Sequence, residues 1–287
     1  MGEADQRTFS LLINWWILPP QVKPAMSTIG TPRVIVLRAP GTNCDEETAA
    51  AWELAGARAE TWHVGRLLEA PQALDGFQIL TIPGGFSYGD DLGAGRILAT
   101  RLGHALGDAL RRFHDRGGLI AGICNGFQVL VRCGLLPGGS FPGAATLAHN
   151  DSGRFEARWI RLLPRPGVSP FVAFAEPIEL PVAHGEGKFL TADPRASQAL
   201  DEAGQIVLKY ADEHDRPTMD YPANPNGSLL AAAGVCDPSG RIFGLMPHPE
   251  RFVAAIHHPR WTRQDGKDTS EEGQGLRIFR GAVAALG

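Results

Sequence analysis

A single cysteine, Cys124, lies in the segment GLIAGICNGFQVL (residues 118–130), where an apolar run gives way to a glycine-containing turn and a helical pattern. Small residues flank it in the frame Gly122-x-Cys124-x-Gly126. A sharp strand-to-helix turn needs such residues because the turn strains the central residue and lifts its side chain out of the core. The N-terminus of the following helix favours the thiolate, the reactive form of cysteine. The spacing therefore predicts a nucleophile elbow, although an isolated cysteine is more often a packed thiol.

A cysteine nucleophile needs a base, and two His-x-Glu pairs are candidates. In LMPHPER (residues 245–251) the prolines beside His248 hold the chain extended, so that His248 and Glu250 project to one side. Glu250 can then orient the imidazole, as the third member of a catalytic triad does. His184 and Glu186 have the same spacing, but glycines replace the prolines and fix the segment less. We therefore expect His248 and Glu250 to serve Cys124, with His184 and Glu186 near the site or at a partner interface.

Acyl transfer also requires hydrogen-bond donors for the developing oxyanion. The segment ILTIPGGFSYGD (residues 79–90) ends an apolar run in Gly84 and Gly85, whose backbone N–H groups can face a reaction centre. The backbone amide of Asn125, directly after the cysteine, is a natural second donor. A glycine turn alone is ordinary, so this interpretation depends on the turn lying at a strand end beside Cys124.

The elements that must position these groups follow two patterns. Between residues 33 and 135, short apolar runs alternate with alanine- and leucine-rich stretches of helical periodicity. The short runs are RVIVLR, ARAETWH, FQILTI and GLIAGI. This alternation predicts βαβ units and a doubly wound, mostly parallel α/β sheet flanked by helices. Beyond residue 150, closely spaced short runs predict additional strands of the same domain, namely ARWIRLL, PIELPVA, QIVLKYA, SLLAAAGV and RIFGLM, before a last helix near GLRIFRGAVAA. Sites in such sheets form beyond the carboxyl ends of the strands.

Composition excludes several classes of function. The 287 residues carry 27 Lys and Arg against 31 Asp and Glu, a net charge of −4 that does not indicate nucleic-acid binding. The four cysteines are far apart, with no CxxC pair or zinc spacing, so we expect no metal, and we interpret Cys44, Cys133 and Cys236 as structural. This usage indicates a reducing, cytoplasmic setting. No phosphate-binding loop is found, so we expect no ATP chemistry and no cofactor in this chain.

The first 32 residues differ from the remainder. FSLLINWWIL (residues 9–18) is apolar for only ten residues, fewer than the ~20 that a membrane span needs, and it lacks the flanks of a secretory signal. We therefore expect no membrane association. Residues 1–32 are interpreted as a disordered extension or a mis-assigned start, and residues 33–287 as one catalytic domain.

Together these motifs resemble the class I, triad-type glutamine amidotransferases, with a GxCxGxQ elbow, an upstream PGG turn and a C-terminal HPE. Within that class, seven segments are similar, in order, to the glutaminase subunits of phosphoribosylformylglycinamidine synthase. These segments are GTNCDEETA, PGGFSYGD, GICNGFQVL, SGRFEARW, AHGEGKF, NPNGS and GLMPHPER. The resemblance as a whole extends over residues 33 to about 285 and excludes the N-terminal 32 residues.

The resemblance implies a reaction and a partner. Cys124 would attack the carboxamide of glutamine, giving a γ-glutamyl thioester and ammonia, while His248 shuttles the proton and Glu250 holds His248. Gln128 and the Gly84–Gly85 turn would help to position glutamine. Ammonia would pass to a formylglycinamide ribonucleotide synthetase subunit, which carries ATP and Mg²⁺, with a small third subunit in some family members.

Other functions remain open from the sequence. A stand-alone cysteine amidohydrolase could use the same elbow, but it would have no need for motifs far from the triad such as FSYGDD and NPNGS. A noncatalytic regulatory subunit would be free to lose one of Cys124, His248 and Glu250. A glutaminase that serves another synthetase is disfavoured only by the family-specific motifs, since a triad does not identify the acceptor of ammonia.

Overall fold

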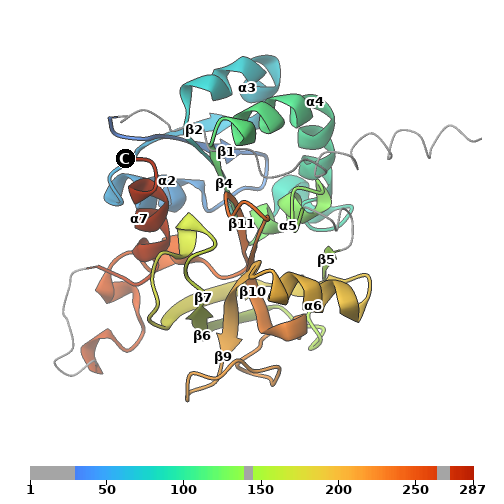
Figure 1. Ribbon diagram of the computed structural model, residues 1–287, viewed down its shortest axis with the longest axis vertical. Helices are drawn as coiled ribbons and strands as arrows, with labels where there is room; N and C mark the ends of the chain where they lie inside the picture. The colour runs from blue at the N-terminus through green and yellow to red at the C-terminus, as the bar shows by residue number, and fades with distance from the viewer. Residues whose placement is uncertain (1–29, 139–144, 264–271) are drawn as a thin grey trace, which may run out of the picture.

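The structure is a computed structural model that describes residues 30–138, 145–263 and 272–287 (Figure 1). The extension expected over residues 1–32 lies outside the described residues except for its last three. The first strand begins at Arg33. The boundary between extension and domain stays a prediction.

A nine-stranded sheet crosses the molecule in the order β2-β1-β3-β4-β11-β10-β9-β6-β7. Its first five strands pair in parallel, namely β2 (Arg58–His63), β1 (Arg33–Arg38), β3 (Ile79–Ile82), β4 (Leu119–Ile123) and β11 (Ile242–Leu245). The remaining four pair antiparallel, namely β10 (Ala232–Cys236), β9 (Ile206–Ala211), β6 (Glu156–Pro164) and β7 (Ile178–His184). Two further strands, β5 (Ala145–Ala148) and β8 (Lys188–Thr191), form a separate antiparallel pair.

The burial of the strands follows their place in the sheet. Every residue of β3 and β4 is buried, as expected for parallel strands covered on both faces, whereas β7 at the antiparallel edge alternates between buried and half-buried residues. The continuous apolar runs ILTI and LIAGI therefore became central strands of the parallel half, whereas β7 has one buried and one more exposed face.

Helices cover the parallel strands on both faces (Figure 1). The α-helices are α2 (Asp45–Leu54), α3 (Val64–Glu69), α4 (Arg96–Asp115), α5 (Asn125–Arg132), α6 (Pro194–Glu202) and α7 (Leu276–Ala284). Short 3₁₀ helices occupy Pro71–Gly76, Ser87–Asp90, Pro170–Val172, Leu229–Ala231, Pro249–Arg251, Ala255–His257 and Trp261–Arg263. Helices α2 and α7 meet edge to face through Trp52 and Phe279, whose ring centroids are 4.9 Å apart, while α4 packs against α5. The predicted doubly wound α/β fold with added strands is confirmed. Among the described residues, no helix is both long and apolar enough to span a membrane.

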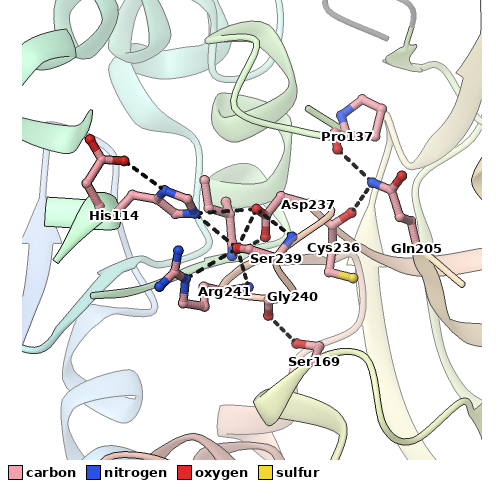
Figure 2. A network of polar contacts seen from close by, with 11 residues as sticks. His114, Pro137, Ser169, Gln205, Cys236, Asp237, Ser239, Gly240 and Arg241 are labelled. Carbon is pink, nitrogen blue, oxygen red and sulfur yellow. Dashed lines mark hydrogen bonds and ion pairs between the residues drawn. The ribbon is translucent and has the colours of Figure 1, made fainter. Parts of the chain in front are cut away.

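A buried polar network fixes the end of the sheet opposite the elbow (Figure 2). Asp237, in the turn between β10 and β11, accepts hydrogen bonds from the backbone N–H groups of Ser239 (3.1 Å) and Ile242 (2.8 Å). His114, at the end of α4, lies 3.4 Å from the same carboxylate. Burial by itself would raise the pKa of Asp237, but His114 and the hydrogen bonds from the Ser239 hydroxyl and the Ile242 N–H outweigh it and lower the pKa. The charged carboxylate thus ties α4 to the hairpin that carries β11.

We expect Asp237→Ala to lower the free energy of unfolding by about 3 kcal/mol, because it leaves buried N–H groups without their acceptor. Urea denaturation at neutral pH measures the change. Glu46→Ala, which removes an exposed carboxylate paired with Arg38, is the control and should change stability far less. Equal losses in the two variants would contradict a special role for the buried carboxylate.

Candidate active site

The chain turns sharply at Cys124, between the end of β4 and the start of α5. Cys124 has φ +51° and ψ −106°, a strained conformation for a residue with a side chain, and it is 5% exposed. A Cβ atom on Gly126 would lie 1.8 Å from the backbone oxygen of Ile82, so only glycine allows α5 to begin this close to β3. The predicted elbow geometry is therefore present.

His248 and Glu250 follow β11, the strand that pairs with β4. His248 Nδ1 lies 2.6 Å from Glu250 Oε1, and both side chains are buried. The backbone N–H of His248 donates to the Pro181 carbonyl on β7 at 2.8 Å, which anchors the segment. Burial alone would lower the pKa of His248, but the charges of Glu250 and Cys124 outweigh it and hold the pKa well above its usual value. This arrangement favours an imidazolium at neutral pH.

The side chains of His248, Cys44 and Cys124 surround Gly84. A Cβ atom placed there would lie 2.8 Å from His248 Cε1, 3.1 Å from Cys44 Sγ and 3.4 Å from Cys124 Cβ. A side chain at this position would therefore displace the histidine or the cysteines. The following residue, Gly85, has φ +135°, and a side chain there would collide with the backbone of residues 41–43. The PGG turn thus lies against Cys124.

A cavity of about 280 Å³ opens beside Cys124. Its size suits a small ligand, since it lies near the lower end of the ~300–1,000 Å³ range typical of small-molecule sites. The lining residues come from six separate segments and are Asn43, Gly85, Phe86, Cys124, Phe155, Ala183, His248 and Arg251. The carbonyl of Ala183 lies 3.8 Å from Cys124 Sγ, so β7 also reaches this cysteine.

The side chains of Asn125 and Gln128 lie behind the elbow and do not line this cavity. Asn125 Nδ2 donates to Gln128 Oε1 at 2.9 Å, and Gln128 Nε2 donates to the backbone oxygen of Glu186 at 2.5 Å. Asn125 Oδ1 accepts from the hydroxyl of Ser87 at 2.6 Å. The carboxylate of Glu186 lies 3.8 Å from Arg132 on α5. This network fixes the loops around the elbow, and direct contact of Gln128 with glutamine stays a prediction.

His184 is the last residue of β7 and is buried, with 3% of its surface exposed. Its Nδ1 lies 3.1 Å from Asn150 Oδ1. Asn150 Nδ2 donates to two backbone carbonyls, which fixes the amide orientation and makes His184 Nδ1 the donor to Oδ1. Burial and then the charge of His248 lower the pKa of His184 to about 4. His184 is therefore a neutral positioning element next to Ala183, and the structure does not place it on the cavity wall.

The lowered pKa of His184 makes stability dependent on pH. Below pH 6.5 the unfolded chain binds a proton on this histidine, while the folded protein binds it only near pH 4, so acidification favours unfolding. We expect this histidine to remove about 2 kcal/mol of folding free energy between pH 7 and pH 5. Urea denaturation of the wild type and His184→Asn at both pH values tests this. An undiminished pH dependence in the variant would show that another group is responsible.

Sequence reasoning missed two residues of this centre, Cys44 and Arg251. Cys44, interpreted as structural, is the N-cap residue of α2, and its Sγ lies 3.9 Å from His248 Nδ1. Arg251 Nη2 donates to Cys44 Sγ at 3.0 Å. Both residues lie within segments that the sequence analysis had marked, GTNCDEETA and GLMPHPER, and that membership was the available signal. Burial raises the pKa of Cys44, which distinguishes it from a nucleophile.

The other two cysteines lie away from the cavity. Burial raises the pKa of Cys133 and of Cys236 to about 12, so both remain inert thiols. Cys44, His248 and Glu250 together place one sulfur, one nitrogen and one carboxylate oxygen within 4.8 Å of one another. His248 Nδ1 is already bonded to Glu250, and the Arg251 cation lies on the Cys44 sulfur. The arrangement therefore favours acid–base chemistry over metal binding at these atoms.

A cysteine elbow on a parallel strand, with His and Glu on the adjacent strand end, is the arrangement of a triad-type glutamine amidotransferase. The family model described as a CobB/CobQ-like glutamine amidotransferase domain matches residues 31–284. The chain is 51% identical to the phosphoribosylformylglycinamidine synthase subunit PurQ of Dehalococcoides mccartyi, over 88% of this chain and 96% of the relative. It is 40% identical to PurQ of Methanococcus maripaludis, again over 88% of this chain and 96% of the relative. The chain belongs to the PurQ family of glutamine amidotransferases.

Solved structures agree with this assignment. The chain superposes on the structure of PurLQS from Thermotoga maritima with a TM-score of 0.68 and 31% identity, over 90% of this chain and 100% of that one. Another glutamine amidotransferase from Thermotoga maritima matches with a TM-score of 0.51 and 14% identity, over 90% of this chain and 99% of that one, which shows the shared fold alone.

Proposed function

We propose that this chain hydrolyses glutamine and delivers the ammonia to a phosphoribosylformylglycinamidine synthetase partner in purine biosynthesis. The observation that carries the proposal is the convergence of Cys124 and His248 at one cavity, with Glu250 hydrogen-bonded to His248, in a chain of the PurQ family. The cavity is small enough for a free amino acid and is lined by both Cys124 and His248.

The reaction follows from the geometry. The Cys124 thiolate attacks the carboxamide carbon of glutamine, and the carbonyl electron pair moves to oxygen. The imidazolium of His248 gives its proton to the departing nitrogen, which leaves as ammonia, and a γ-glutamyl thioester remains. A water molecule then attacks the thioester while His248, now neutral, takes a proton from it. This step releases glutamate and restores the Cys124 thiolate. Glu250 stabilises the imidazolium and fixes its orientation through Nδ1.

Backbone donors would stabilise the oxyanion of both tetrahedral intermediates. The position of Gly84 and Gly85 against Cys124, and of Asn125 at the first turn of α5, supports this role for their N–H groups. Each such donor typically contributes a factor of about 10²–10³ in kcat. Gln128 would contribute indirectly, since it holds the 184–187 loop against α5.

The partner assignment rests on family membership. The Thermotoga maritima relative was solved as PurLQS, so we propose that this chain assembles with a PurL-type synthetase and a small PurS-type protein. We assign ATP and Mg²⁺ to the synthetase. We place the protein in the cytoplasm, a setting supported by its four unpaired thiols.

The test is peptide mass spectrometry after incubation with a glutamine-mimicking diazoketone, with and without excess glutamine. We expect one adduct, on Cys124, that glutamine prevents. If the isolated chain is unlabelled, the experiment is repeated with the synthetase present, and labelling then shows activation by the partner. Absence of labelling in the complex would reject the glutaminase proposal, and ammonia release without any synthetase would favour a stand-alone amidohydrolase.

A further inference from the structure

The cavity beside Cys124 contains a cation that the proposed reaction does not use. Arg251 lies directly after Glu250 and lines the cavity together with Cys124 and His248. Among the described residues, no aspartate or glutamate lines it. The carboxylates nearest to this half-buried guanidinium lie outside the cavity and beyond hydrogen-bond length, so its N–H donors remain available for an anionic ligand group.

The contacts of Arg251 leave most of its donors available. A guanidinium has five N–H donors. Within the described part of the chain, Arg251 makes one hydrogen bond, to the neutral acceptor Cys44 Sγ at 3.0 Å. The nearest carboxylate oxygens are those of Glu47, at 3.8 Å, and Glu250, at 4.0 Å. Both exceed hydrogen-bond length, and Glu250 already holds His248.

The remaining walls match the stem of an amino acid. Phe86 and Phe155 line the cavity and are 48% and 53% exposed, so their rings offer apolar surface at its mouth. Asn43 adds a neutral polar group to the cavity. Its Oδ1 accepts a hydrogen bond from Cys44 Sγ at 3.1 Å. The methylene stem of such a ligand would contact the two rings. A carboxamide at one end of the stem would contact Cys124, and a carboxylate at the other end would contact Arg251.

We propose that Arg251 binds the α-carboxylate of the substrate and so restricts the site to free amino acids. This inference rests on the proposed glutaminase function and adds the group that selects the substrate. Cys44 holds Arg251 in place. Its sulfur lies between the Arg251 guanidinium and the His248 imidazole, so it fixes the distance between the group that binds the carboxylate and the triad. A planar fork of donors suits a bidentate contact with a carboxylate.

The experiment combines a variant with a substrate analogue. Ammonia release by the complex with the synthetase is measured for glutamine and for glutaminamide, in which the α-carboxylate is replaced by a neutral amide. We expect the wild type to prefer glutamine by roughly 10- to 100-fold in kcat/KM, the effect of one charge-assisted contact. Arg251→Gln should lower kcat/KM for glutamine by a similar factor, mainly through KM, and affect glutaminamide much less, so that the preference disappears. Arg251→Lys, which keeps the charge and loses the fork, should be intermediate.

Two results would overturn the inference. One is a wild type that does not discriminate between the two substrates. The other is an Arg251→Gln variant that loses the same factor with both, because that pattern means that Arg251 acts through Glu250 or Cys44 on the triad. Arg277→Gln on α7, an exposed arginine paired with Glu176, is the matched control and should retain the preference. Failure of the glutaminase proposal looks different: the wild-type complex would neither release ammonia from glutamine nor be labelled by the diazoketone.

Discussion

Cys124→Ala should abolish ammonia release from glutamine, with a loss of at least about 10³-fold in kcat, because no other described thiol lines the cavity and could form the thioester. The synthetase complex that contains the variant should still use free ammonia, since only the supply of ammonia is removed. Coupled assays of product formation with glutamine and with ammonium chloride separate the two outcomes.

Cys133→Ser is the control for Cys124→Ala, because that thiol lies away from the cavity and should change glutamine use by less than about threefold. Thermal unfolding of both variants shows whether either substitution disturbs the fold. Glutamine-dependent activity retained by Cys124→Ala would remove the nucleophile assignment. Loss of ammonia-dependent synthesis as well would mean that the substitution disrupts the complex rather than the chemistry.

Glu250→Gln should lower kcat by about 10³–10⁴-fold, the scale seen when the acidic member of a triad becomes an amide. Among the groups that raise the pKa of His248 against the effect of burial, the Glu250 carboxylate has the largest effect, ahead of Cys124 and Cys44. Without it the pKa of His248 falls, so we expect the imidazolium that protonates the leaving ammonia to be lost at neutral pH. Proton NMR of His248 across a pH titration tests the cause directly: the ring should be protonated at pH 7 in the wild type and neutral in the variant.

Glu179→Gln is a matched control for Glu250→Gln. Glu179 also pairs with a buried histidine, His258, at 2.8 Å, but neither residue lines the cavity. We expect its kcat to stay within about threefold of the wild type. If both glutamate variants lose activity equally, the effect comes from general destabilisation.

The sequence predicted the fold because its central strands have an unmistakable pattern. RVIVLR became β1 without change of bounds, and the apolar run GLIAGI became β4. The strands β5 and β8 were not predicted, because each has four residues and burial of only one of them, so neither shows an apolar run or a clear alternation. They are stabilised by pairing with each other, which is a non-local contact.

Predicting the site was easier for backbone positions than for side-chain partners. Gly84 and Gly126 were marked by turn chemistry, and the structure shows why a side chain fits at neither. Cys44 escaped notice because a lone cysteine beside a helix start carries no spacing signal. Its proximity to His248 depends on the pairing of β1 with β3, of β3 with β4 and of β4 with β11. Arg251 escaped notice because an arginine at the end of a motif is indistinguishable in the sequence from a solvated one, and only the structure shows that it lines the cavity.

The contacts of β7 connect catalysis to the completion of folding. Ala183 and Pro181 belong to the last strand of the antiparallel half, yet their carbonyls meet Cys124 and the backbone of His248. The elbow itself is local in sequence, so it can form early, whereas these contacts close only after strands separated by long stretches of chain have paired. A nascent or partly unfolded chain therefore has a cysteine but no assembled centre. Such a chain cannot consume glutamine, and the appearance of glutaminase activity in a refolding experiment would time the docking of β7.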